Sequence, residues 1–113
     1  MNWHPLTSVE QLEKVMEESA TTPVVIFKHS TTCPISATAK SRLERQWQGA
    51  GLDHVKSYYL DLLSYRPVSN KVAEVLDVKH ESPQLLLVNG GECTYNASHL
   101  GISVDALKTK LKA

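Results

Sequence analysis

The 113-residue sequence predicts an α/β domain whose mixed β-sheet is covered by helices on both faces. Two observations support this class. First, short runs rich in β-branched and aromatic residues alternate with segments whose apolar residues recur at helical spacing. Second, Asn89-Gly90-Gly91 separates the last two strand-like runs, which predicts an antiparallel hairpin beside parallel strands. The length fits one domain over residues 1–113.

An initial helix and a β-α-β-α pattern account for the first part of the chain. The initial helix is expected from about Ser8 to Ser19, with Thr7 as its cap. Residues 23–27 form an apolar run, which is typical of a central strand covered on both faces. A helix opened by Pro34 follows this strand. Its sheet-facing stripe is expected to consist of Ile35, Ala39, Leu43 and Trp47.

The remaining segments complete the order β-α-β-α-β-β-α behind the initial helix. A strand is expected over residues 55–62, and Pro67 opens the helix after it. The strand at residues 84–88 pairs through the hairpin with residues 92–95, and the last helix covers about residues 103–112. This order predicts a thioredoxin-like domain with a four-stranded mixed sheet. The helix opened by Pro67 is expected to bury Val68, Val72, Val75 and Leu76.

Charge and cysteine content exclude several classes of function. Lys plus Arg and Asp plus Glu both total 12, so no overall field attracts nucleic acid or an anionic membrane. The N-terminus has no basic segment followed by an apolar one, and no apolar run reaches membrane-spanning length, so we expect a cytoplasmic location. Cys33 and Cys93 stand 60 residues apart, which predicts free thiols and no metal site. Cys93, in a predicted strand, is expected to be a buried structural thiol.

Cys33 is the candidate catalytic residue. It follows a predicted strand and a Ser/Thr-rich loop, and Pro34 stands where the first turn of a helix tolerates a missing N–H. A thiolate at a helix N-terminus faces unpaired backbone N–H groups and the positive end of the helix dipole. Because this stabilisation makes the sulfur a good leaving group, it favours turnover of a mixed disulfide more than first attack.

Ser36 stands where a two-cysteine redox motif would place its resolving thiol, so we expect monothiol chemistry. Cys33 would attack the low-molecular-weight side of a protein mixed disulfide, release the reduced protein and wait for an external thiol. Ser36 either hydrogen-bonds the thiolate or simply occupies the first helical turn. With Thr32 and Pro34, it forms the expected support around the cysteine.

A second group of candidate residues follows from the predicted thioredoxin-like fold. Ser82-Pro83 precedes the third predicted strand, where such folds carry a cis-proline facing the cysteine. We expect this bond to be cis and the Ser82 backbone to pair with the peptide-like part of a bound thiol. Lys28, His29 and His99 are candidate contacts of the thiol cosubstrate. The alternatives are a lysine that only meets solvent at a strand end and histidines satisfied at the surface or in the core.

Three segments carry a family resemblance. Residues 28–36 (KHSTTCPIS) resemble the active-site segment of the monothiol bacilliredoxin family, also called YtxJ-like, and the likeness extends over nearly the whole chain. Residues 78–84 (VKHESPQ) resemble its second signature, and Ser98-His99 with Ile102 resembles a third, weaker one.

This resemblance implies a thioredoxin-fold thiol-disulfide oxidoreductase. Its expected activity is removal of bacillithiol from mixed disulfides on cytosolic proteins, with Cys33 as nucleophile and S-thiolated proteins as partners. Bacillithiol is the implied cosubstrate, and no bound cofactor or metal is expected. Because bacillithiol carries a malate, Lys28 and the backbone near Ser82 gain weight as cosubstrate contacts.

Other functions stay open at this point. An arsenate reductase would need an arginine shortly after the cysteine, and the nearest, Arg42, stands over two helical turns away. Classical monothiol glutaredoxins carry the motif Cys-Gly-Phe-Ser and a glycine pair before the last helix, whereas Gly90-Gly91 here belong to a predicted hairpin. The alternatives are a glutaredoxin-like iron-sulfur carrier and a non-catalytic interaction module on the same fold.

Overall fold

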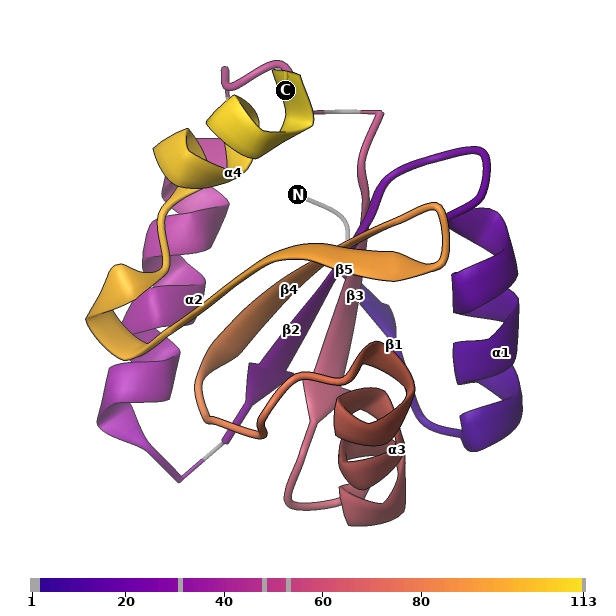
Figure 1. Ribbon diagram of the computed structural model, residues 1–113. Helices are drawn as coiled ribbons and strands as arrows, with labels where there is room; N and C mark the ends of the chain where they lie inside the picture. Colours follow the sequence, from indigo (N-terminus) through magenta and orange to yellow (C-terminus); the bar gives the residue numbers. More distant parts are fainter. Residues whose placement is uncertain (1–2, 31, 48, 53, 113) are drawn as a thin grey trace.

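The computed structural model describes residues 3–30, 32–47, 49–52 and 54–112. At its centre lies a five-stranded sheet with the order β1-β3-β2-β4-β5 (Figure 1). The strands are β1 (Trp3–Pro5), β2 (Val24–His29), β3 (Lys56–Asp61), β4 (Gln84–Asn89) and β5 (Glu92–Ser98). The helices are α1 (Val9–Glu18), α2 (Pro34–Trp47), α3 (Arg66–Leu76), the short 3-10 helix η1 (His99–Gly101) and α4 (Val104–Lys112). Within the described ranges, no helix is both long and apolar enough to span a membrane.

The sheet is mixed, as predicted, but it has one strand more than the four expected. β3 pairs in parallel with β1 and β2, whereas β4 pairs antiparallel with β2 and β5 pairs antiparallel with β4. The additional strand, β1, has three residues and ends in Pro5. Neither its length nor its composition signals a strand. The proline is tolerated because β1 lies at the edge of the sheet, where a missing N–H disrupts no inner ladder.

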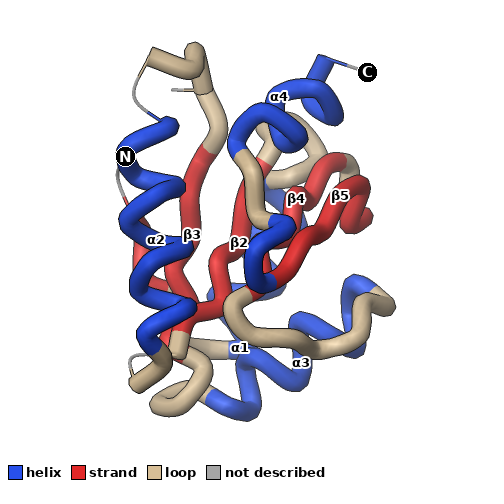
Figure 2. The backbone as a smooth tube through the Cα atoms, turned by 90° about the vertical axis from the view of Figure 1, so that its left-hand side faces the viewer, coloured by secondary structure: helices blue, strands red, loops and turns tan. Residues whose placement is uncertain are grey.

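β2 supplies the centre of two apolar cores, because its side chains alternate between the faces of the sheet. Val24 and Ile26 pack with α1 and α3, whereas Val25 and Phe27 pack with α2 and α4. None of these four side chains has exposed surface. Figure 2, viewed from the side of α2 and α4, shows these two helices in front of the strands. Helices therefore cover both faces, as the sequence predicted.

The N-cap of α1 is Ser8, one residue after the predicted Thr7. The Ser8 hydroxyl accepts a hydrogen bond from the Gln11 N–H at 3.1 Å. The Gln11 side chain in turn accepts from the Thr7 N–H at 2.8 Å. Ser8 is preferred as the cap because the two residues together satisfy free donors at the helix start, in the manner of a capping box.

Two apolar residues that were expected to face the sheet are exposed. Ile35 in the first turn of α2 is 52% exposed, and Val75 near the end of α3 is 44% exposed. A stripe with four-residue spacing drifts by about 40° per step around a helix, so Ile35 lies far from the direction of Trp47. Ser36 is buried in its place. Val75 faces a surface groove between α3 and α1.

The hairpin between β4 and β5 forms where the sequence predicted it. Gly90 and Gly91 adopt φ values of 65° and 79°, and Asn89 pairs with Glu92 across the turn. Positive φ at both central residues matches the twist of the flanking strands and favours glycine. β5 continues to Ser98, three residues beyond the predicted end at Tyr95.

Candidate active site

Cys33 directly precedes the first residue of α2, as predicted. Its carbonyl accepts the first helical hydrogen bond, from the Ala37 N–H at 3.1 Å, and its own N–H donates to the Ser30 carbonyl at 3.1 Å. The residue is half-buried and its thiol is free. Cys33 thus occupies the N-cap position, beside the N–H groups of the first turn of α2 that have no partner within the helix.

The residues flanking Cys33 connect β2 to α2. Pro34 is the first residue of α2, where its fixed φ suits the helix and its missing N–H has no role. Thr32 is exposed, and its hydroxyl lies 3.3 Å from the Ser30 hydroxyl. Thr31, in the predicted loop, lies outside the described residues.

The Ser36 hydroxyl bonds to the end of β2. Ser36 has no exposed surface, and its Oγ accepts from the Ser30 N–H at 3.1 Å. The same oxygen lies 2.6 Å from Nδ1 of His29. Since the Ser30 N–H occupies one acceptor position of this oxygen, the hydroxyl proton is free to be donated to Nδ1. The sequence placed Ser36 at the thiolate or in a plain helical turn, and the bond to His29 was missed.

His29 is a buried, neutral partner of Ser36. Its side chain stacks on the Phe27 ring and is 7% exposed. Burial lowers the pKa of His29, and the Lys40 charge lowers it further, whereas Asp61 acts in the opposite direction. A neutral imidazole can accept the Ser36 proton at Nδ1, so the pair is satisfied without a charge.

The Ser82-Pro83 peptide bond is cis, which confirms the prediction from the fold. Pro83 directly precedes β4, whose first residue, Gln84, lies opposite Lys28 of β2. The cis-proline is therefore at the end of the sheet where β2 leads into the Cys33 loop. The Ser82 hydroxyl is buried and has no hydrogen-bond partner within the described part of the chain.

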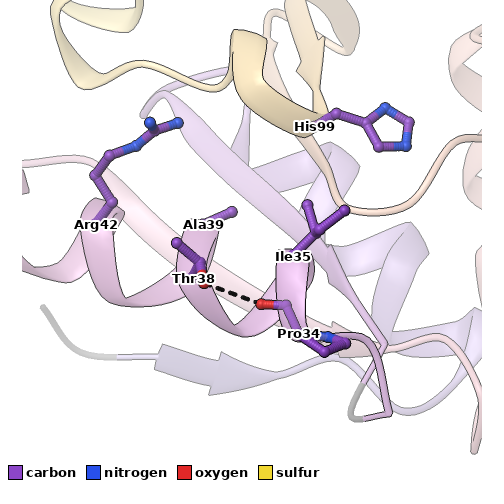
Figure 3. A pocket seen from close by; sticks show the side chains of 6 residues that line it. All are labelled: Pro34, Ile35, Thr38, Ala39, Arg42 and His99. Atoms are coloured by element: carbon purple, nitrogen blue, oxygen red, sulfur yellow. Dashed lines mark hydrogen bonds between the residues drawn. The ribbon is translucent and has the colours of Figure 1, made fainter.

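His99 lies beside this proline, on the opposite wall of a pocket from α2. The His99 N–H donates to the Pro83 carbonyl at 3.1 Å, and its backbone takes the left-handed conformation with φ of 53°. Its side chain lines a pocket of about 190 Å³ together with residues of α2 (Figure 3). The residues that line this pocket are Pro34, Ile35, Thr38, Ala39, Arg42 and His99.

Lys28 points to the opposite face of the sheet, toward α3. It has no exposed surface, and its Nζ donates to the Ser69 carbonyl at 3.2 Å and lies 3.1 Å from Nδ1 of His80. Burial lowers the pKa of Lys28 to about 8. Neither a solvated strand-end lysine nor a cosubstrate contact matches this placement, because the ammonium has no surface to offer a ligand. His80, in the second signature segment, was missed as its partner.

Cys93 lies half-buried in β5, opposite Val88 near the hairpin. Its Sγ donates to the Tyr95 carbonyl at 3.3 Å. Burial raises the pKa of the Cys93 thiol, and hydrogen bonds lower it by less. The thiol is therefore held in its protonated form, unlike a nucleophilic cysteine. Among the residues that the structure describes, no three His, Cys, Asp or Glu side chains gather as metal ligands.

Comparison with known proteins decides the family. Residues 4–107 match the family model described as monothiol bacilliredoxin BrxC. The chain belongs to the monothiol bacilliredoxin family. A solved structure described as an oxidoreductase with a thioredoxin fold shares 34% identity, with a TM-score of 0.80, covering 96% of this chain and 93% of that one. Both findings support thiol-disulfide redox chemistry for this bacilliredoxin.

More distant structures establish the fold alone. The thioredoxin of Trypanosoma brucei brucei is 18% identical with a TM-score of 0.75, covering 98% of this chain and 88% of that chain. The thioredoxin of Fasciola hepatica is 15% identical with a TM-score of 0.73, covering 96% of this chain and 97% of that chain. The bacilliredoxin thus has the thioredoxin fold that its element order predicted.

Replacing Lys28 by methionine should reveal the buried ammonium through the pH dependence of stability. The pKa of Lys28 is about 8 in the folded protein and 10.5 ordinarily. Between these pH values the unfolded chain binds more protons, so the wild type should gain stability over Lys28→Met as the pH rises, by at most about 1.4 kcal/mol per pH unit. Urea unfolding of both proteins at pH 7, 8, 9 and 10 measures this difference.

Lys14→Met is the matched control for this experiment, because Lys14 lies exposed on α1 and its ammonium stays in water in both states. Its stability difference from the wild type should not change over the same pH range. A constant difference for Lys28→Met as well would contradict the burial of its amine.

Replacing Ser36 by alanine should destabilise the protein by about 1–3 kcal/mol, because the partly buried Ser30 N–H and the buried His29 Nδ1 would each lose a partner. Ser41→Ala, on the exposed side of the same helix, is the control and should change stability by less than about 0.5 kcal/mol. Urea denaturation at pH 7 compares the two variants. Equal effects would show that the Ser36 hydroxyl contributes nothing beyond helix propensity.

Proposed function

We propose that this bacilliredoxin removes bacillithiol from mixed disulfides on cytoplasmic proteins, using Cys33 as its nucleophile. The observation that carries the proposal is a free, half-buried thiol at the N-terminus of α2, with a serine where a resolving cysteine would stand. Family membership supports the same chemistry. The bacillithiol specificity is inferred from the family name.

The reaction takes place in two thiol-disulfide exchanges. In the first, the Cys33 thiolate attacks the bacillithiol sulfur of the mixed disulfide, a new S–S bond forms, and the target protein leaves as a thiolate that takes a proton from water. In the second, the thiolate of another small thiol attacks the bacillithiol sulfur, and Cys33 leaves as a thiolate. The target is reduced, and the two small thiols end as a disulfide.

The N-cap position suits Cys33 to the second exchange. A leaving thiolate departs faster when its charge is stabilised, and here it would face the free N–H groups of α2. Because residue 36 is a serine, it supplies no sulfur to resolve the adduct. Its hydroxyl forms hydrogen bonds with His29 and Ser30 instead. An external thiol is therefore required.

Ser82 and Pro83 are proposed to hold the peptide-like part of the bound thiol. They lie at the start of β4, beside the end of β2 that leads to Cys33. The buried Ser82 hydroxyl without a described partner gives a second reason, since a buried polar group normally forms a hydrogen bond. A thiol bound here would supply that partner.

Mass spectrometry on reduced protein tests the proposal. One target peptide is prepared with bacillithiol and, separately, with glutathione in mixed disulfide linkage. Wild type and Cys93→Ser should both take up bacillithiol on Cys33 and release the free peptide, because Cys93 is held as a protonated thiol away from the helix N-terminus. Cys33→Ser should release none. Faster transfer of glutathione than of bacillithiol would contradict the specificity, and transfer of neither would reject the activity.

A further inference from the structure

The pocket between α2 and η1 begins next to the nucleophile and ends at a cation. Pro34, the residue after Cys33, lines one end, and Arg42 lines the other (Figure 3). Arg42 stands eight positions after Pro34, which corresponds to about 12 Å along the helix. Ile35 and Ala39 give the pocket apolar walls between these ends. A molecule joined to Cys33 could therefore extend along α2 and reach the guanidinium.

The Arg42 side chain is anchored by a hydrogen bond, but no salt bridge neutralises its charge within the described residues. Its Nη2 donates to the Ile102 carbonyl at 2.8 Å, which anchors the side chain to the segment before α4. A guanidinium has five N–H donors, so the remaining donors are available for a ligand. No carboxylate within the described ranges forms a salt bridge with Arg42, and none of the six lining residues is acidic. Glu44, on the same helix, pairs with Lys40 instead.

The geometry points to Arg42 as the residue that selects an anionic small thiol. When Cys33 carries such a thiol in a mixed disulfide, the arm of the thiol lies in this pocket and its terminal carboxylate pairs with Arg42. This inference rests on the proposed function and deepens it. Bacillithiol fits the class because its malate carboxylates lie at the opposite end of the molecule from its sulfur. Arg42 contacts no reacting atom, so its contribution is to specificity.

A purely structural role for Arg42 makes a different prediction. If the bond to Ile102 serves only to hold η1 and α4 against α2, its loss should slow the reaction of Cys33 with every mixed disulfide equally. If Arg42 binds a carboxylate, the loss should be confined to anionic thiols. A substrate pair that differs only in the small thiol separates these roles.

The experiment measures second-order rate constants for the reduced protein with one peptide carrying either bacillithiol or neutral 2-mercaptoethanol in disulfide linkage. Arg42→Gln should react about tenfold or more slowly with the bacillithiol adduct, because a hydrogen-bonded ion pair is lost. Its rate with the mercaptoethanol adduct should stay within about twofold of the wild type. Arg42→Lys should recover part of the loss, since the charge returns without the planar fork.

Arg45→Gln is the matched control, because Arg45 lies exposed on the same helix outside the pocket lining. It should react with both adducts at the wild-type rate. Equal slowing of both adducts by Arg42→Gln, or slowing of neither, overturns the inference while leaving the proposed function intact. A wild type that forms no Cys33 adduct with either substrate overturns both. Circular dichroism and the urea midpoint show that each variant is folded.

Discussion

The hydrogen bonds of the Ser36 hydroxyl fix the position on which the candidate site depends. They join the first turn of α2 to the last residue of β2 and to the residue after it. Cys33 lies between these attachment points, so its loop is held at both ends. In a dithiol enzyme the equivalent position supplies the second sulfur. Here the hydroxyl donates and accepts in the protein interior, which a weakly hydrogen-bonding thiol would do poorly. The same residue thus strengthens the scaffold and makes the chemistry monothiol.

The C-terminal end of β2 carries two buried polar side chains on opposite faces of the sheet. His29 faces α2 and bonds Ser36, whereas Lys28 faces α3 and bonds the Ser69 carbonyl. Burial lowers the pKa of both side chains, which favours the neutral form of each. Burying a polar side chain costs desolvation free energy that an apolar residue at the same place would not incur. The hydrogen bonds of His29 and Lys28 offset this cost. The polar end of this apolar strand coincides with the end of the sheet that carries the candidate nucleophile.

Local patterns predicted the elements of the fold, and tertiary partners explain most of what they missed. The apolar run of β2, the Pro34 helix start and the glycine hairpin each have a signal within a few residues, and all three appear where expected. β1 has no such signal, because three residues form a strand only through β3 beside them. For the site, the position of Cys33 and the cis bond at Pro83 followed from the element order. The partners of Lys28 and Ser36, and the pocket that ends at Arg42, depend on side-chain directions that sequence spacing does not determine.

A monothiol mechanism demands more of the surface around its nucleophile than a dithiol mechanism does. The same sulfur must react twice with molecules from solution, so the bound small thiol has to be held while the second thiol approaches. The hydrogen bond from the His99 N–H to the Pro83 carbonyl joins the two sides of this surface. One side is the start of β4, where we propose that the peptide-like part of the thiol binds, and the other is the pocket along α2. This backbone bond keeps the two sides together, so under the proposed function a thiol that contacts both would be held at two points while the second thiol attacks its sulfur.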